Sequence, residues 1–456
     1  MKKQLFISVL CSMLLTPILS CEEVLDVDVP QNQMQAPLVF ENTQTANAAL
    51  AALYAGLYDN SPLAGDQTGR LLGIYTDELD FFAPTATNGT LELFLNVHAD
   101  SNPSILTYWT NAYQKIYVAN AIIEGVERSL ALPAAERSRI KGEALLVRSI
   151  LFYMLEEVFG DLPYPDSTDY TVNKNLGRTP AAQVLQRLEA DLAAAEPLLG
   201  DTYLNAERIY PNRHVCRLMR AKVYLSQGRA PEAEILLKTI IQSPLYAFQN
   251  DLTKVFTKTG THILWQLRPK NQGDGTKEAL LYYFNNSAPS QSALSSSLMA
   301  ELGTGDLRKQ YWTAAVTAAG NTWYRADKYK NRTANSTEYS VIFRLEEVYL
   351  LLAESLMQQN KVAEALPYVN ATRTRASLTP LQLPLSPDGL KTEILKEYRK
   401  EFFTERGIRF FSLKRMGRLN DLATIKPNWK PEHRLWPVPQ KELLLNPNLK
   451  PQNPGY

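Results

Sequence analysis

The sequence has few of the residues that build disulfide frameworks and metal sites. It contains three cysteines and four histidines among 456 residues. Cys11 and Cys21 lie near the N-terminus and Cys216 stands alone, so no disulfide framework is expected. We expect Cys216 to be a small core residue. The histidines are scattered along the chain, which predicts neither a metal site nor a bound cofactor: His98, His214, His262 and His433.

Charge bias and enzyme motifs are also missing. The chain has Lys+Arg 48 against Asp+Glu 47, so nothing in its charge favours nucleic acid binding. It contains no Gly-x-Ser-x-Gly elbow, no His-Glu-x-x-His and no phosphate-binding glycine loop. Asp77, Glu78 and Asp80 form one acidic run, whereas a glycosidase holds two carboxyl groups on opposite sides of a sugar. These residues fit hydrogen-bond acceptors better, and the sequence predicts a protein that is not an enzyme.

Only the first twenty residues form a long apolar run. Lys2 and Lys3 precede the apolar segment 5–19, the pattern of an export signal over residues 1–20. Ile18-Leu19-Ser20-Cys21 is similar to a bacterial lipobox, although Leu19 stands where a small residue is more usual. We therefore expect a lipid on Cys21, an acidic tether over residues 21–42, and attachment to the membrane by the lipid alone.

Helical periodicity dominates the rest of the chain. Apolar residues recur at helical spacing in many segments, and strands are expected to be few and short. The predicted helices are 43–58, 108–130, 134–159, 179–199, 213–227, 231–241, 342–359, 362–377 and 390–406. The predicted strands are 261–267 and 279–284. The sequence thus predicts a mostly α-helical protein.

A repeat is visible within this helical pattern. Residues 221–233 reappear as residues 353–365, with matching alanine, glutamine, basic and glutamate positions at a constant offset. Each copy reads as helix, turn at Gly228 or Asn360, and helix, which is typical of a tetratricopeptide-like hairpin. A single αα-hairpin without repeat ancestry would look alike, but two copies in register favour the repeat. A long insertion separates them.

Two irregular regions interrupt the helices. We divide the chain after the tether into a helical region over 43–242, a loop-rich insertion over 243–340, and a helical region with a closing tail over 341–456. A second irregular stretch covers residues 60–107. Loops on a rigid scaffold commonly carry binding residues, and aromatic faces with nearby polar groups capture sugars or peptides. The ligand-binding candidates are Asp80, Phe81, Phe82, Asn88, Trp265, Tyr283, Trp312, Trp323 and Tyr324.

Several sequence blocks follow one another along the chain: 48–58, 111–123, 141–164, 344–354, 369–376, 401–409 and Asn453-Pro454-Gly455-Tyr456. In this order they resemble the SusD/RagB family of Bacteroidetes surface lipoproteins. The likeness covers nearly the whole chain, although Ser412 stands where aspartate is usual and Ile408 where histidine is common. Arg148 and Arg409 in these blocks, and Arg415 shortly after the block 401–409, are expected to pair with carboxylates such as Glu143 and Glu405.

The resemblance implies a function that composition alone does not. A family member would sit on the outer face of the outer membrane, bind an oligosaccharide, and deliver it to a TonB-dependent SusC-like transporter. Binding of oligopeptides, as in RagB-like members, is the alternative, and a surface glycoside hydrolase is a third hypothesis. The tail, whose prolines keep it extended, is expected to lock the helical body without touching ligand.

Overall fold

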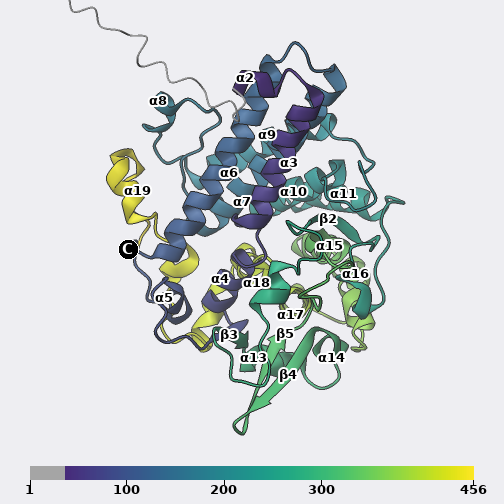
Figure 1. Ribbon diagram of the computed structural model, residues 1–456. Coiled ribbons are helices and arrows are strands. Elements are labelled where there is room, and N and C mark those ends of the chain that lie inside the picture. The colour runs from purple at the N-terminus through teal and green to yellow at the C-terminus, as the bar shows by residue number, and fades with distance from the viewer. Residues whose placement is uncertain (1–35) are drawn as a thin grey trace, which may run out of the picture.

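Helices make up most of the structure (Figure 1). The computed structural model describes residues 36–456. The helices of its first half are α2 (Ala36–Val39), α3 (Thr43–Asp59), α4 (Thr68–Tyr75), α5 (Thr90–Leu95), α6 (Pro103–Arg128), α7 (Ala134–Phe159), α8 (Tyr170–Asn173), α9 (Ala181–Ala195), α10 (Arg213–Ser226) and α11 (Ala230–Ile241). The later helices are α12 (Lys277–Leu281), α13 (Ser296–Leu302), α14 (Leu307–Trp312), α15 (Leu345–Gln358), α16 (Val362–Arg375), α17 (Pro387–Phe402), α18 (Ile408–Arg415) and α19 (Gln440–Leu445).

Within residues 36–456, six short strands form three antiparallel pairs. β1 (Leu79–Phe81) pairs with β3 (Ser292–Leu294), β2 (Ile263–Leu267) with β6 (Ser340–Arg344), and β4 (Thr313–Ala318) with β5 (Asn321–Ala326). The strand predicted over 261–267 is confirmed as β2. The strand predicted over 279–284 is wrong, because the Thr276 side chain caps the N-terminus of α12 and this segment begins as a helix.

Local capping signals set the ends of the long helices. Asn102 accepts hydrogen bonds from the N–H groups of Ser104 and Ile105, and Pro103 occupies the first turn of α6, where its missing N–H costs nothing. α7 ends at Gly160, whose φ of 71° lies in the left-handed region that glycine tolerates. Together α6 and α7 form the long hairpin at the centre of the helical scaffold.

The two repeat copies lie side by side although a long insertion separates them in sequence. α10 packs on α11, α15 packs on α16, and α11 packs on α15, so the hairpins stack. Gly228 and Asn360 occupy the same turn position with φ of 74° and 60°. The Ser355 hydroxyl donates to the Ala230 carbonyl at 2.7 Å across the stack. The mostly helical, tetratricopeptide-like fold predicted from the sequence is thus confirmed.

The C-terminal tail crosses the helical body. The Trp436 ring is buried against Tyr75, Tyr108 and Phe159, with ring centroids 5.4–6.1 Å apart. The Asn453 amide donates to the carbonyl of Phe159 at 2.9 Å and to that of Trp436 at 2.7 Å. These contacts tie the last residues of the chain to the end of α7.

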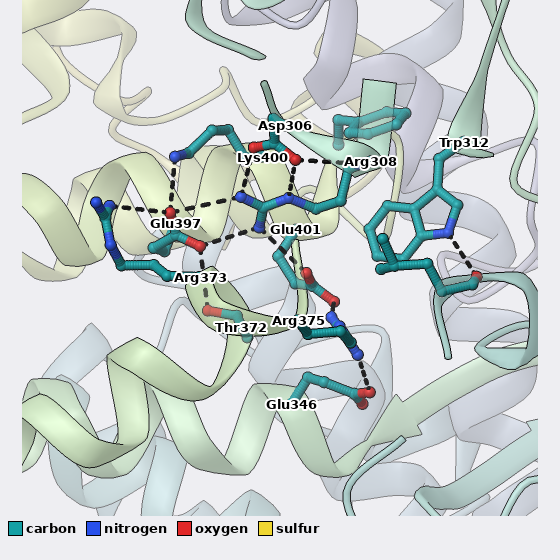
Figure 2. Close-up of polar contacts among 12 residues, drawn as sticks. Asp306, Arg308, Trp312, Glu346, Thr372, Arg373, Arg375, Glu397, Lys400 and Glu401 are labelled. Carbon is teal, nitrogen blue, oxygen red and sulfur yellow. Dashed lines mark hydrogen bonds and ion pairs between the residues drawn. The ribbon is translucent and has the colours of Figure 1, made fainter. Parts of the chain in front are cut away.

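A buried ion network joins α14 to α16 and α17 (Figure 2). Arg308 lies 2.7 Å from Asp306, 2.9 Å from Glu397 and 3.3 Å from Glu401, and all four side chains are fully buried. Arg375 links Glu401 to Glu346 in the same network. Because α14 runs directly into β4, this network fixes the base of the β4–β5 hairpin.

Candidate functional site

The candidate site lies where the β1–β3 pair meets the β4–β5 hairpin, at the lower end of the molecule in Figure 1. Asp80 and Phe81 belong to β1, opposite Ala293 and Ser292 of β3. Phe82 continues this pairing, since its N–H donates to the Gln291 carbonyl at 2.7 Å. The short strand therefore holds three predicted site residues in one rigid, extended segment.

The hairpin brings an aromatic partner from more than two hundred residues away. Trp323 of β5 lies opposite Val316 of β4, and its ring meets that of Phe82 edge to face with centroids 6.4 Å apart. Phe284, Ala293 and Val316 form a small hydrophobic cluster beneath these two rings. The cluster is separate from the main core, and the rings of Phe82 and Trp323 are only partly buried. They form an aromatic platform at the surface.

Trp265 and Trp312 are not at this platform, which corrects the prediction that they contact ligand. Their side chains are 0% and 1% exposed. The Trp265 indole N–H donates to the Ile209 carbonyl at 3.0 Å, and that of Trp312 to the Leu252 carbonyl at 2.9 Å, as Figure 2 shows for Trp312. Each ring is enclosed by the core with its one polar group satisfied, so no face is open to a ligand.

The remaining aromatic candidates divide between surface and core. Tyr283 is exposed, and it directly precedes Phe284 of the small cluster beneath the platform. Tyr324 follows Trp323 on β5 and so points to the opposite face, where it packs against the main core. Phe81 is half-buried, with its ring centroid 6.1 Å from that of Phe94. The structure thus keeps Phe82, Trp323 and Tyr283 as the accessible aromatic group.

The polar candidates have local partners. Asn88 is exposed, and its side-chain oxygen accepts from the Thr90 N–H at 3.2 Å and from the Thr90 hydroxyl at 2.6 Å, so it shapes the turn before α5. Asp80 accepts a long hydrogen bond from the Ser296 N–H at 3.4 Å, and partial burial raises the pKa of its carboxyl. Both retain oxygen lone pairs that a ligand hydroxyl can use.

Asp77 and Glu78 serve the structure instead. Burial favours the neutral form of Asp77, but the guanidinium groups of Arg409 at 2.9 Å and Arg399 at 3.2 Å outweigh it and hold the pKa low. Burial and the neighbouring Asp77 charge raise the pKa of Glu78 to about 8. Its carboxylate accepts from the Thr404 N–H at 3.3 Å. Both carboxyls are enclosed behind β1, where a ligand does not reach.

Two of the scattered histidines meet near the C-terminus. The rings of His98 and His433 are 5.4 Å apart, and the Tyr456 hydroxyl lies 2.7 Å from His98 Nε2. Burial and the His433 charge lower the pKa of His98 to about 3. Within residues 36–456, no three His, Cys, Asp or Glu side chains are grouped to hold a metal ion. Over the same residues, every helix is too short or too polar to cross a membrane.

Two adjacent hollows lie along α6, away from the aromatic platform. The larger, about 810 Å³, lies between α6, α8 and α19, and the second, about 630 Å³, extends toward the end of α6. Tyr117 lines both. Exposed apolar side chains are frequent here: Tyr117, Val118, Leu130, Tyr170 and Leu445 all line one or both hollows. We call this surface the α6 face.

Family models match most of the chain. A model described as "Starch-binding associating with outer membrane" matches residues 24–225, and one described as "SusD family" matches residues 277–456. The chain belongs to the SusD/RagB family. Its relatives include the SusD-like proteins P25 and P2 of Formosa agariphila, which are 24% and 25% identical. The P25 match covers 94% of this chain and 95% of the relative, and the P2 match covers 91% and 93%.

Solved structures confirm the SusD/RagB fold. A SusD superfamily protein from Bacteroides vulgatus superposes with a TM-score of 0.79 at 20% identity, covering 91% of this chain and 99% of its own. The surface glycan-binding protein A of Bacteroides thetaiotaomicron, solved with laminarihexaose, gives a TM-score of 0.75 at 17% identity and covers 90% and 99%. Likeness at these identities establishes the architecture of this SusD/RagB protein.

The sequence did not single out the cations beside the platform. Arg325 follows Trp323 by two residues on β5, and Arg332 lies in the next loop; both guanidinium groups stack on the Tyr283 ring. Side chains alternate between the two faces of a strand, so a strand predicted at β5 would have placed Arg325 on the same face as Trp323. Nothing local signals the contact of Arg332 with Tyr283, because it joins two separate loops.

Proposed function

We propose that this SusD/RagB protein is a surface lipoprotein that captures an oligosaccharide and delivers it to a TonB-dependent SusC-like transporter. The observation that carries glycan capture is the platform of Phe82 and Trp323, with Tyr283 beside it. Partly exposed aromatic rings next to free oxygen acceptors suit the apolar faces and hydroxyl groups of sugars. A solved structure named "Laminarin binding SusD-like protein" has the same fold, with a TM-score of 0.75.

The membrane part of the proposal rests on sequence. Cys21, the proposed lipid attachment site, lies outside the described residues. Residues 22–35 separate it from α2, and a chain of this length spans at most about 50 Å. α2 packs against α6, so the anchor would hold the α6 face near the membrane and its transporter. The exposed apolar side chains of that face suit contact with a protein partner.

Calorimetry on the unlipidated chain beginning at residue 22 tests glycan capture. We expect a neutral or charged oligosaccharide from a broad panel to bind, and Phe82→Ala and Trp323→Ala each to weaken it about tenfold, because each removes an aromatic face from the platform. Tyr170→Ala is the matched control, since it removes an exposed aromatic ring on α8, far from the hairpin.

The same experiment separates the alternatives. Binding of oligopeptides with no glycan bound would place the protein with the RagB-like peptide binders and refute the proposal. Release of new reducing ends from a bound polysaccharide would indicate a glycoside hydrolase. Loss of affinity in Tyr170→Ala but not in Trp323→Ala would show that the ligand binds at the other end of the molecule.

A further inference from the structure

Two arginine side chains stack on the Tyr283 ring. The guanidinium carbon of Arg332 is 3.6 Å from the ring centroid, and that of Arg325 is 4.7 Å from it. Tyr283 still keeps 37% of its surface exposed. A cation stacked on an aromatic ring is attracted by the ring and is held in a defined orientation. The stack therefore presents positioned positive charge at the molecular surface.

This stack continues the aromatic platform. Trp323 and Arg325 are two residues apart on β5 and therefore lie on the same face of the hairpin. Arg325 Nη1 donates to the Phe284 carbonyl at 2.8 Å, and the Phe284 ring belongs to the cluster beneath Phe82 and Trp323. A ligand lying across Phe82 and Trp323 would thus reach the Tyr283 stack without leaving the surface.

The carboxylates near Arg332 are bound by other groups, so none of them neutralises its charge. Asp327 is shared by Arg325 and Lys330, each at 3.2 Å. Glu338 accepts from the backbone N–H groups of Lys330 and Asn331 at 3.0 Å. Among residues 36–456, no carboxylate lies within ion-pair distance of Arg332, and its side chain donates no hydrogen bond. Its N–H groups remain available to a ligand.

The guanidinium chemistry of Arg332 favours one class of ligand. A guanidinium presents paired N–H groups in a plane, which match the two oxygens of a carboxylate or of a sulfate ester. A neutral sugar needs no such charge. We propose that the platform takes an anionic glycan, carrying carboxylate or sulfate groups, and that Arg332 contacts those groups while Phe82 and Trp323 pack against the sugar rings. This inference rests on the proposed glycan-binding function.

Calorimetry with four oligosaccharides tests the inference on the unlipidated chain. Oligogalacturonate supplies carboxylates, carrageenan oligosaccharides supply sulfates, and laminarin and maltose oligosaccharides are neutral. We expect one anionic class to bind at least about tenfold more tightly than either neutral one, and Arg332→Gln to remove that advantage. Added salt should weaken anionic binding, since the contact is at the surface. The two anionic probes distinguish a carboxylate ligand from a sulfated one.

Two further variants keep the result specific. Arg332→Lys keeps the charge but loses the paired geometry, so its affinity should fall between those of wild type and Arg332→Gln. Arg187→Gln is the matched control: Arg187 of α9 is stacked on Tyr164 at 5.1 Å, in the helical scaffold away from the hairpin. The Arg187→Gln variant should bind the anionic oligosaccharide as tightly as wild type does. Thermal unfolding checks that each variant is folded.

The outcomes separate this inference from the proposed function. Neutral oligosaccharides bound as tightly as anionic ones, or anionic binding unchanged in Arg332→Gln, would overturn the anionic class and leave glycan capture standing. Binding of no oligosaccharide at all, neutral or anionic, would overturn both. Loss of anionic binding in Arg332→Gln, with neutral binding unchanged, supports the inference.

Discussion

Arg308 and Glu397 form a fully buried ion pair, with Arg308 Nη1 2.9 Å from Glu397 Oε2 (Figure 2). Arg308 reaches from α14 to the middle of α17, so this pair fixes the helix that leads into β4. The aromatic platform is therefore held by charges in the protein interior as well as by the packing of its own small cluster.

Removal of the Arg308 guanidinium should strongly destabilise the protein. Arg308→Ala leaves the buried carboxylates of Asp306, Glu397 and Glu401 without their shared cation, which should lower the free energy of unfolding by about 3–5 kcal/mol. Urea unfolding measures this loss. Arg128→Ala, which breaks an exposed ion pair with Glu124, is the control and should lower the free energy of unfolding by only a small fraction of that amount. Equal losses in the two variants would show that the buried network does not carry this stability.

The Glu78 carboxyl should make stability depend on pH. Its pKa is about 8 in the folded chain, above the ordinary value of 4.5. Between these values the unfolded chain has lost the proton that the folded chain still binds, so stability falls as pH rises and the loss is complete above about pH 8. Glu78→Gln mimics the neutral form and should gain about 2–4 kcal/mol relative to wild type at pH 8, but little at pH 4.

Urea unfolding across this pH range measures the Glu78 effect. Glu364→Gln makes the same change at an exposed position on α16 and should leave the pH dependence as in wild type. A Glu78→Gln difference that is constant with pH would show that this carboxyl is already ionised in the folded protein.

The Asn453 amide should hold the tail in place. Asn453→Ala leaves the buried carbonyls of Phe159 and Trp436 without their donor, which should cost about 2 kcal/mol or more. Hydrogen exchange of the Trp436 backbone N–H, which donates to the Val158 carbonyl, should become faster. Asn448→Ala removes an exposed tail hydrogen bond to Asn175 and is the control. Unchanged exchange at Trp436 in Asn453→Ala would mean that ring packing alone fixes the tail.

The α6 face should carry the proposed transporter contact. Tyr117→Glu and Leu445→Glu place charge among exposed apolar side chains and should abolish co-purification with the SusC-like transporter from outer membranes, because a buried unpaired charge is costly at an interface. Glycan binding by the purified protein should not change. Ile235→Glu, at an exposed position on α11, is the control. Co-purification that survives both α6-face variants would place the contact elsewhere.

The sequence predicted the scaffold well because its signals are local. Helical periodicity and caps act within a few residues, and the repeat turn needs a residue that tolerates a positive φ, which Gly228 and Asn360 supply. The buried position of Cys216 was also predicted correctly. The register of β5 against β4, which sets the neighbours of Trp323, was not predicted, since neither strand shows a clear alternating pattern.

Partners of buried charges were harder to predict. The three arginines expected to pair with carboxylates do so, but Arg148 pairs with Asp191, Arg409 with Asp77 and Arg415 with Glu354. The expected acids are bound elsewhere: Glu143 by Arg139, and Glu405 by Arg344 and Lys328. A long side chain reaches a partner on any helix that packs beside its own, and that choice follows from packing rather than from sequence spacing.

The sequence by itself determined the helical scaffold, the paired hairpins and the blocks of the SusD/RagB family, because each depends on residues close together in the chain. Only the tertiary structure decided which tryptophans are core and which are surface. Trp312 and Trp323 are equally apolar and eleven positions apart, yet the core encloses one and the hairpin exposes the other. That difference arises because burial depends on which distant segments pack against a side chain: Trp312 meets the segment around Leu252, whereas Trp323 meets Phe82, from a much earlier part of the chain.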